Sequence, residues 1–320
     1  MGETVLKKQG FKKCFLVFLM LAFILAAVSS CTGDVNQVPV SSEINTSISS
    51  SEYVTSETSG SSIADKVIAS GIEIADNDDT VKAFKVYRDD LEIDGVLYLP
   101  EGTGPFPVCF IAQGLGASYY GYEDIAVNLA SEGIAAALMN FTAKDGTFSV
   151  ITEAEDLMAV VDGITSLPYI YCRNTFLWGH SFGGLVVSYA GCEYFPYYSE
   201  KIKGLILVEP SFDFQERYRK SYPSVSDIPD DVRYGKIFYE DLLSFDIYEK
   251  MPAFGGKVVI FAGTEKGSIG FGKPEIFEKA QKSFSNAGIT PVEGADHYFG
   301  DTGREAMIRG TIDFIKNNME

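Results

Sequence analysis

Gly179-His180-Ser181-Phe182-Gly183 is a Gly-x-Ser-x-Gly pentapeptide, and it lies between two apolar stretches. The stretch before it, Thr175–Trp178, reads as a strand, and Gly184–Ala190 after it reads as the first turns of a buried helix. A sharp strand-to-helix turn projects its central side chain outward, and it needs small flanking residues because the two backbones pass close together. The pattern predicts that Ser181 is a nucleophile; a bare pentapeptide of this kind can also be purely structural.

Strands and helices alternate on both sides of this pentapeptide. Two period-2 stretches, Val81–Tyr87 and Leu91–Leu99, predict an opening antiparallel pair. Further strands are predicted over Pro107–Ala112, Ile134–Phe141, Thr175–Trp178, Ile202–Val208, Lys257–Ala262 and Ile289–Val292. Helices are predicted over Tyr120–Glu132, Thr152–Leu167, Pro274–Asn286 and Arg304–Asn317. This order predicts an α/β fold, with a mostly parallel sheet covered by helices on both faces.

The ends of the predicted strands bring several polar or small residues to one edge of the sheet. Gln113, Ser181, Glu209 and Gly263 each lie at or just after the carboxyl end of a strand. Ligands of open α/β sheets bind at that edge. The coincidence favours Ser181 as a nucleophile over a structural serine.

The alternation stops between residues 210 and 251. This segment is rich in tyrosine and phenylalanine, and it is too long for a simple strand-to-helix connection. We expect an inserted cap of short helices over the strand ends. Its aromatic side chains either line a substrate cleft or form only the small core of the cap itself.

A serine nucleophile needs a base within hydrogen-bond reach, and histidine titrates in the right range. The chain has two histidines. His180 neighbours Ser181, and its side chain is expected to point into the packing beneath the turn. His297 follows the last predicted strand, where the base falls in the chain order serine, acid, histidine. The sequence therefore predicts His297 as the base.

The acid that orients this histidine is expected in the loop after strand Val258–Ala262. Glu265 is the carboxylate of that loop and the preferred candidate. Asp213, just after the preceding strand, is the alternative. Asp296 adjoins the base and is expected to cap or solvate its own loop.

The oxyanion hole requires two backbone N–H groups aimed at one point. Phe182, the residue after the nucleophile, is expected to supply one. Leu115, within the glycine-rich turn Gly114-Leu115-Gly116, is expected to supply the other. A glycine-rich turn without catalytic purpose is the alternative interpretation.

The N-terminal part of the chain is typical of an exported lipoprotein. Residues 1–30 combine a basic start with a short apolar run, as in a cleavable signal peptide. Val28-Ser29-Ser30-Cys31 resembles the bacterial lipoprotein signal, in which the cysteine is diacylated; an ordinary signal with an incidental cysteine is the alternative. The composition of residues 31–62 predicts a disordered tether. The length of residues 63–320 suits one large α/β domain. We therefore expect a bacterial, lipid-anchored, extracytoplasmic protein.

Charge and cysteine usage narrow the class of protein. The net charge is −18, which argues against nucleic acid and anionic substrates. Cys109, Cys172 and Cys192 are expected to be buried free thiols, although a Cys172–Cys192 bridge is conceivable. The spacing of histidines and cysteines predicts no metal site, and no cofactor is expected.

With these pieces in place, the chain resembles the α/β-hydrolase superfamily, and within it the bacterial cinnamoyl/feruloyl-esterase-like group related to dienelactone hydrolases. The resemblance covers roughly Val81 to Asn317. It is carried by Asp145-Gly146-Thr147-Phe148, Gly179–Gly183, Gly235–Leu242 and Glu293–His297. It implies the α/β-hydrolase fold and cleavage of a small-molecule carboxylic ester through an acyl-enzyme intermediate.

Two positions depart from the pattern of this family. Gln113 stands where the family usually has histidine, and Lys266 stands where it has the acid. These departures motivate a second hypothesis, in which the protein has kept the fold as a binding module and lost efficient catalysis.

Overall fold

The computed structural model describes residues 68–69, 71–75, 78–142 and 147–320. The chain divides into two units, Met1–Ser59 and Gly60–Glu320, and the first lies outside the described residues. The predicted signal peptide, the tether and the proposed lipid site Cys31 also lie outside them. The fold described below belongs to the second unit.

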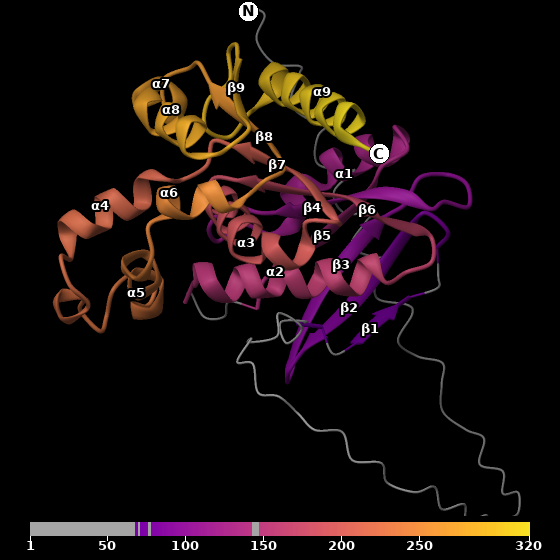
Figure 1. The fold of residues 1–320 in the computed structure, drawn as a ribbon, viewed down its shortest axis with the longest axis horizontal. Helices are drawn as coiled ribbons and strands as arrows, with labels where there is room; N and C mark the ends of the chain where they lie inside the picture. The colour runs from indigo at the N-terminus through magenta and orange to yellow at the C-terminus, as the bar shows by residue number, and fades with distance from the viewer. Residues whose placement is uncertain (1–67, 70, 76–77, 143–146) are drawn as a thin grey trace, which may run out of the picture. The chain divides into compact units, whose positions relative to one another are not determined.

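A nine-stranded sheet of order β1-β2-β3-β5-β4-β6-β7-β8-β9 forms the centre of this unit (Figure 1). Its strands are β1 Gly71–Ile74, β2 Val81–Arg88, β3 Leu91–Tyr98, β4 Phe106–Ala112, β5 Ala135–Met139, β6 Ile170–His180, β7 Ile202–Val208, β8 Lys257–Gly263 and β9 Ala287–Val292. The pairs from β1 to β3, and β3 with β5, are antiparallel, and all other pairs are parallel. The predicted mostly parallel sheet is confirmed.

Helices connect the parallel strands. They are α1 Glu123–Ser131, α2 Val150–Thr165, α3 Phe182–Tyr198, α4 Asp213–Ser221, α5 Lys236–Ser244, α6 Ile247–Lys250, α7 Ile269–Gly272, α8 Pro274–Ser283 and α9 Asp301–Asn318. In the part of the chain that the structure describes, none of them has the length and hydropathy of a membrane span.

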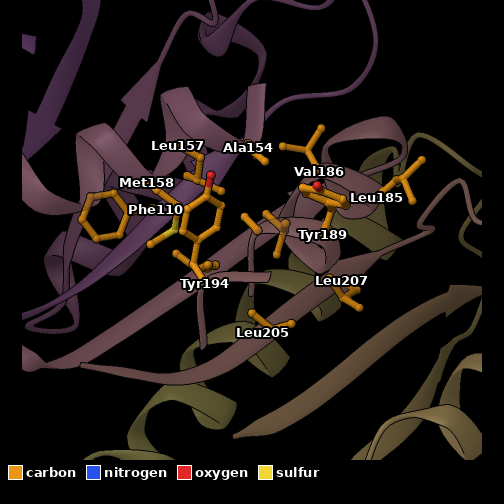
Figure 2. Packing of buried hydrophobic residues seen from close by; sticks show 14 of the residues in the cluster. Phe110, Ala154, Leu157, Met158, Leu185, Val186, Tyr189, Tyr194, Leu205 and Leu207 are labelled. Carbon is orange, nitrogen blue, oxygen red and sulfur yellow. The ribbon is translucent and has the colours of Figure 1, made fainter. Parts of the chain in front are cut away.

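The central strands bury side chains on both faces because each face is covered by helices. Phe110, Leu177 and Leu205 point into one apolar cluster together with α2 and α3. Figure 2 shows this cluster, in which side chains of α2 and α3 pack over strands of the sheet. Their strand neighbours, such as Phe176 and Trp178, point into a second cluster together with α1 and α9. The period of two along each strand therefore divides the core into two layers.

Three short helices, α4, α5 and α6, fill the predicted insertion between β7 and β8 (Figure 1). Phe214 and Phe238 of these helices pack against each other and against Phe182, the residue after Ser181. Phe182 and Phe238 are fully buried. Of the two interpretations of the cap aromatics, these contacts favour a core of the cap.

Local details differ from the predicted boundaries. Strand β6 begins at Ile170, five residues before the predicted start, because its first residues pair with the start of β4 across an irregularity in register. Strand β1 adds an edge that the sequence patterning did not predict. Cys109, Cys172 and Cys192 are free thiols, so the conceivable Cys172–Cys192 bridge is absent.

Candidate active site

The pentapeptide forms the sharp turn between β6 and α3. Ser181 has φ 56° and ψ −117°, a strained conformation for a residue with a side chain. A Cβ on Gly179 would lie 2.3 Å from the carbonyl oxygen of Gly183, and a Cβ on Gly183 would lie 2.3 Å from that of Ala112. Glycine is therefore required at both positions by the close approach of backbones.

The hydroxyl of Ser181 has two hydrogen-bond neighbours. Nε2 of His297, in the loop after β9, lies 3.0 Å from Ser181 Oγ. The hydroxyl of buried Ser211 lies 3.1 Å from the same oxygen. The N–H of Ser211 also donates to the Ser181 carbonyl at 2.9 Å, so the segment after β7 is tied to the turn. Ser211 is a contact that the sequence patterning did not indicate.

The carboxylate beside the other ring nitrogen belongs to Glu209. Oε2 of Glu209 lies 3.4 Å from Nδ1 of His297, a distance at the long end of hydrogen bonding. Glu209 is fully buried, and it has φ 46°, a second strained residue at a strand end. Its oxygens accept N–H groups from Gly263 at 2.8 Å, Gly270 at 3.1 Å and Ile269. These donors hold the carboxylate in place and stabilise its negative charge.

The structure corrects the two predicted acids. Glu265 is exposed; its backbone N–H donates to the Ala295 carbonyl at 2.9 Å, and its own carbonyl accepts the N–H of Ser268 at 3.1 Å. Asp213 pairs with Arg217 and with Lys273, at 3.0 Å from Lys273 Nζ, and thus lies in the cap. Asp296 accepts the N–H of Tyr298 at 2.9 Å, within its own loop.

The signal for Glu209 was its place directly after β7. The preferred sequence candidate, Glu265, lies one strand later, after β8, and the alternative, Asp213, follows β7 as Glu209 does. In the sheet these strands are neighbours: Val208 pairs with Phe261, and the N–H of Glu209 donates to the Phe261 carbonyl at 3.0 Å. A carboxylate after β7 therefore reaches nearly the same point in space as one after β8.

Of the predicted oxyanion-hole residues, Phe182 directly follows Ser181, and Leu115 belongs to the turn whose Gly114 lies beside Ser181. Phe182 is the first residue of α3, so its N–H has no acceptor within the helix. Leu115 follows Gly114, and a Cβ on Gly114 would lie 3.5 Å from Ser181 Cβ. The N–H of Gly114 itself donates to the hydroxyl of Tyr122 at 3.0 Å. Among the residues of this turn, Leu115 remains the candidate for the second donor.

His180 joins the glycine-rich turn Gly114-Leu115-Gly116, called the oxyanion turn below after its predicted role, to the loop that carries His297. Its Nε2 lies 2.7 Å from the backbone carbonyl of His297, and because a carbonyl only accepts, Nε2 carries the proton. Its Nδ1 is then an acceptor, and it receives the hydroxyl of Tyr122 at 2.9 Å. The line of bonds runs from the Gly114 N–H through Tyr122 and His180 to His297. The side chain expected to pack beneath the turn is thus a polar bridge.

Burial above all, together with the nearby His297 and Arg304, lowers the pKa of His180 to about 4, against the raising effects of its bond to the His297 carbonyl and of the nearby Glu209. His180 is therefore neutral at neutral pH. The neutral form is the one that can both accept from Tyr122 and donate to His297.

Residues 68–69, 71–75, 78–142 and 147–320 contain no group of three or more histidine, cysteine, aspartate or glutamate side chains arranged to hold a metal ion. The candidate site brings a serine, a histidine and a carboxylate into contact, with Ser181 Oγ beside one ring nitrogen of His297 and Glu209 beside the other.

Part of the chain matches a known protein family. Residues 103–233 match the family model described as hydrolase, serine aminopeptidase S33. This segment includes Gly114-Leu115-Gly116, Ser181 and Glu209, and it ends before His297. No curated protein matches the chain.

Solved structures resemble the chain over most of its length. Est1E from Butyrivibrio proteoclasticus is 18% identical, with a TM-score of 0.64 over 74% of this chain and 98% of that one. A dienelactone hydrolase from Anabaena variabilis is 15% identical, with a TM-score of 0.57 over 78% and 99%. The esterase domain of a Rhodothermus marinus protein is 17% identical, with a TM-score of 0.57 over 74% and 98%. The chain therefore has the α/β-hydrolase fold, and the family match supports a hydrolase.

Proposed function

We propose that the protein is a serine hydrolase that cleaves a carboxylic ester through an acyl-enzyme intermediate. The observation that carries this proposal is the continuous line from Ser181 Oγ through both ring nitrogens of His297 to the buried carboxylate of Glu209. Nucleophile, base and orienting acid in this relation form the triad of serine hydrolases.

In the first half-reaction, Ser181 Oγ attacks the ester carbonyl while its proton passes to Nε2 of His297. The N–H groups of Leu115 and Phe182 stabilise the oxyanion that forms. The tetrahedral intermediate then collapses, the bond to the alcohol oxygen breaks, and His297 returns the proton to that oxygen. Glu209 holds Nδ1–H toward itself and stabilises the imidazolium that exists between the two transfers.

In the second half-reaction, His297 takes a proton from water, and the resulting hydroxide attacks the acyl-serine carbonyl. Collapse of this intermediate releases the carboxylic acid, and the proton on His297 returns to Ser181. Both half-reactions use only the ester, water and the protein groups named above.

A fluorophosphonate probe tests the nucleophile directly. The wild type should be labelled, and Ser181→Ala should not. Ser211→Ala is the matched control, since it removes the neighbouring hydroxyl while leaving the nucleophile, and it should still be labelled. A folded wild-type protein that stays unlabelled would overturn the proposal.

The substrate bond is tested with matched nitrophenyl esters and nitroanilides of the same acyl groups. An ester hydrolase turns over the esters and leaves the anilides largely intact. Preferential cleavage of aminoacyl anilides would instead indicate the peptidase activity named in the matching family model. The binding-module hypothesis rested on Gln113 and on Lys266 in the acid's place, and Glu209 at Nδ1 of His297 supplies the carboxylate that the second departure removed.

For the N-terminal part of the chain, we propose a lipid anchor at Cys31 on the extracytoplasmic side of a bacterial membrane. Its support is the sequence Val28-Ser29-Ser30-Cys31 after a basic and apolar start. Metabolic labelling with palmitate should mark the wild type and not Cys31→Ser. A soluble, unlabelled wild type would contradict the anchor.

A further inference from the structure

A cavity of about 370 Å³ lies next to the glycine-rich turn, and Gly114 and Gly116 of that turn form part of its wall. Its described lining comes from the segments after β4 and β5 and from the start of α2: Gln113, Gly114, Gly116, Ala117, Ser118, Asn140, Phe141, Phe148 and Glu153. Gly114 belongs both to this lining and to the contact with Ser181. A group in the cavity can therefore be part of a molecule bound at the nucleophile.

Gln113 is the first residue that points to a ligand here. It is 5% exposed, and among the described residues its carbonyl Oε1 has no hydrogen-bond partner. A buried amide oxygen without a partner costs about 1–3 kcal/mol, so it calls for a donor that is absent from the described protein. A ligand hydroxyl in the cavity supplies that donor.

Glu153 is the second residue of the cavity that points to a ligand. It is 2% exposed and lies on α2 with the buried carboxylate of Asp156 nearby. Burial raises the pKa of Glu153 well above its usual range, and the charges of Asp156 and Asp241 raise it further, against a hydrogen bond from the Ser149 backbone. Asp156 forms an ion pair with Arg88 and accepts hydrogen bonds from the N–H and the hydroxyl of Thr142. A neutral carboxyl group donates one hydrogen bond and accepts others.

The remaining walls suit an uncharged group. Phe141 and Phe148 offer apolar surface, and the described lining contains no lysine or arginine that could hold an anion. The volume of the cavity falls in the range of small-molecule sites.

We propose that the Gln113–Glu153 cavity is a substrate subsite for an uncharged, hydroxyl-bearing group of the ester. The hydroxyl donates to Oε1 of Gln113 and accepts from the carboxyl group of Glu153. This inference rests on the proposed ester hydrolysis. It adds that Gln113 and Glu153 decide which ester substrates the protein prefers.

Paired esters that exchange a hydroxyl for a methyl group test it. On the acyl arm, p-nitrophenyl ω-hydroxyhexanoate is compared with p-nitrophenyl heptanoate; on the alcohol arm, hydroxyethyl butanoate is compared with propyl butanoate. The readout is the ratio of the two kcat/KM values, which does not depend on the fraction of folded enzyme. For one arm the wild type should favour the hydroxyl ester at least about tenfold.

The variants locate that preference. Gln113→Met and Glu153→Leu should bring the ratio close to one, whereas Glu153→Gln, which keeps a neutral donor, should retain most of it. Gln281→Met is the matched control, because Gln281 is an exposed glutamine on α8, and its ratio should equal that of the wild type. A wild-type ratio near one on both arms, or a ratio that survives Gln113→Met and Glu153→Leu, would overturn the proposal.

Two further experiments distinguish the proposed subsite from a cation site and from a failure of the proposed ester hydrolysis. Preference for choline butanoate over its uncharged carbon isostere would mean that the acidic groups serve a cation, and the proposal would fail. If no ester is hydrolysed, the proposed function fails instead, and ligand-observed NMR with Ser181→Ala decides the subsite. Binding of hydroxyethyl butanoate but not propyl butanoate, lost in Ser181→Ala/Gln113→Met, supports the subsite, and equal binding of both esters refutes it.

Discussion

At the scale of single residues, two positions with a strained backbone conformation lie in the candidate active site. Ser181 and Glu209 both have positive φ, and both directly follow a strand of the parallel sheet. Such conformations persist only where surrounding contacts hold them. For Ser181 these contacts include its N–H bond to the Val208 carbonyl at 2.9 Å, and for Glu209 the three N–H groups around its carboxylate.

Replacing Glu209 with glutamine should lower kcat for an ester substrate by about 10³-fold or more. The amide keeps the size of the side chain but removes the charge that orients His297 and stabilises its protonated form. Steady-state kinetics measures this. Glu265→Gln is the matched control and should stay within about twofold of the wild type. The reverse ranking would restore Glu265 as the acid.

Replacing Gly183 with alanine should destabilise the protein by about 1–3 kcal/mol or prevent folding. The added methyl carbon would lie 2.3 Å from the Ala112 carbonyl and 2.4 Å from that of Gln113, and backbone cannot move aside as a side chain can. Denaturant unfolding gives the free energy. Gly288→Ala, at an open position of β9, should change it by less than about 0.5 kcal/mol. Equal effects at both positions would refute the steric explanation.

At the scale of elements, the site depends on loops that follow different strands. The oxyanion turn follows β4, the nucleophile follows β6, Glu209 follows β7 and His297 follows β9. Tyr122 and His180 connect the first of these loops to the last. The relative position of the oxyanion donor and the base is thus set by side-chain hydrogen bonds as well as by the sheet.

Tyr122→Phe should lower kcat more than it changes KM, because it frees the Gly114 N–H and Nδ1 of His180 and loosens the oxyanion turn against the base. Each unpaired buried group also costs about 1–3 kcal/mol of stability. Kinetics and thermal unfolding are measured together. Tyr120→Phe changes an exposed tyrosine of the 3-10 helix Tyr119–Tyr122, to which Tyr122 also belongs, and should be neutral in both. Unchanged kcat in Tyr122→Phe would show that the bridge has no part in positioning.

At the scale of the whole molecule, pH acts on stability through buried titratable groups. The folded-state pKa of His180 is about 4, below its ordinary value of 6.5. Between these values the unfolded chain binds more protons than the folded chain, so stability falls as pH falls from 6.5 through 4. Glu153 acts in the opposite direction, because its raised pKa makes stability fall as pH rises above the ordinary value for glutamate.

We therefore expect the wild type to lose about 3 kcal/mol more stability than His180→Gln between pH 7 and pH 4. The difference between the two proteins isolates the contribution of His180, since all other groups titrate in both. Urea unfolding at a series of pH values measures it. Parallel pH profiles for the two proteins would mean that His180 keeps its ordinary pKa in the folded state.

The sequence by itself determined the order of strands and helices, the turn that carries Ser181, and His297 as its partner. The physical reason is that hydrophobic periodicity is local, the glycines mark a close backbone crossing, and a chain with two histidines offers few choices of base. The tertiary structure alone decided the carboxylate. Which acid reaches His297 depends on β7 lying beside β8 in the sheet, and on backbone donors from the segment after β8 that gather around Glu209. The same holds for the bridge through Tyr122 and for the Gln113–Glu153 cavity, since both join residues that only the folded sheet brings together.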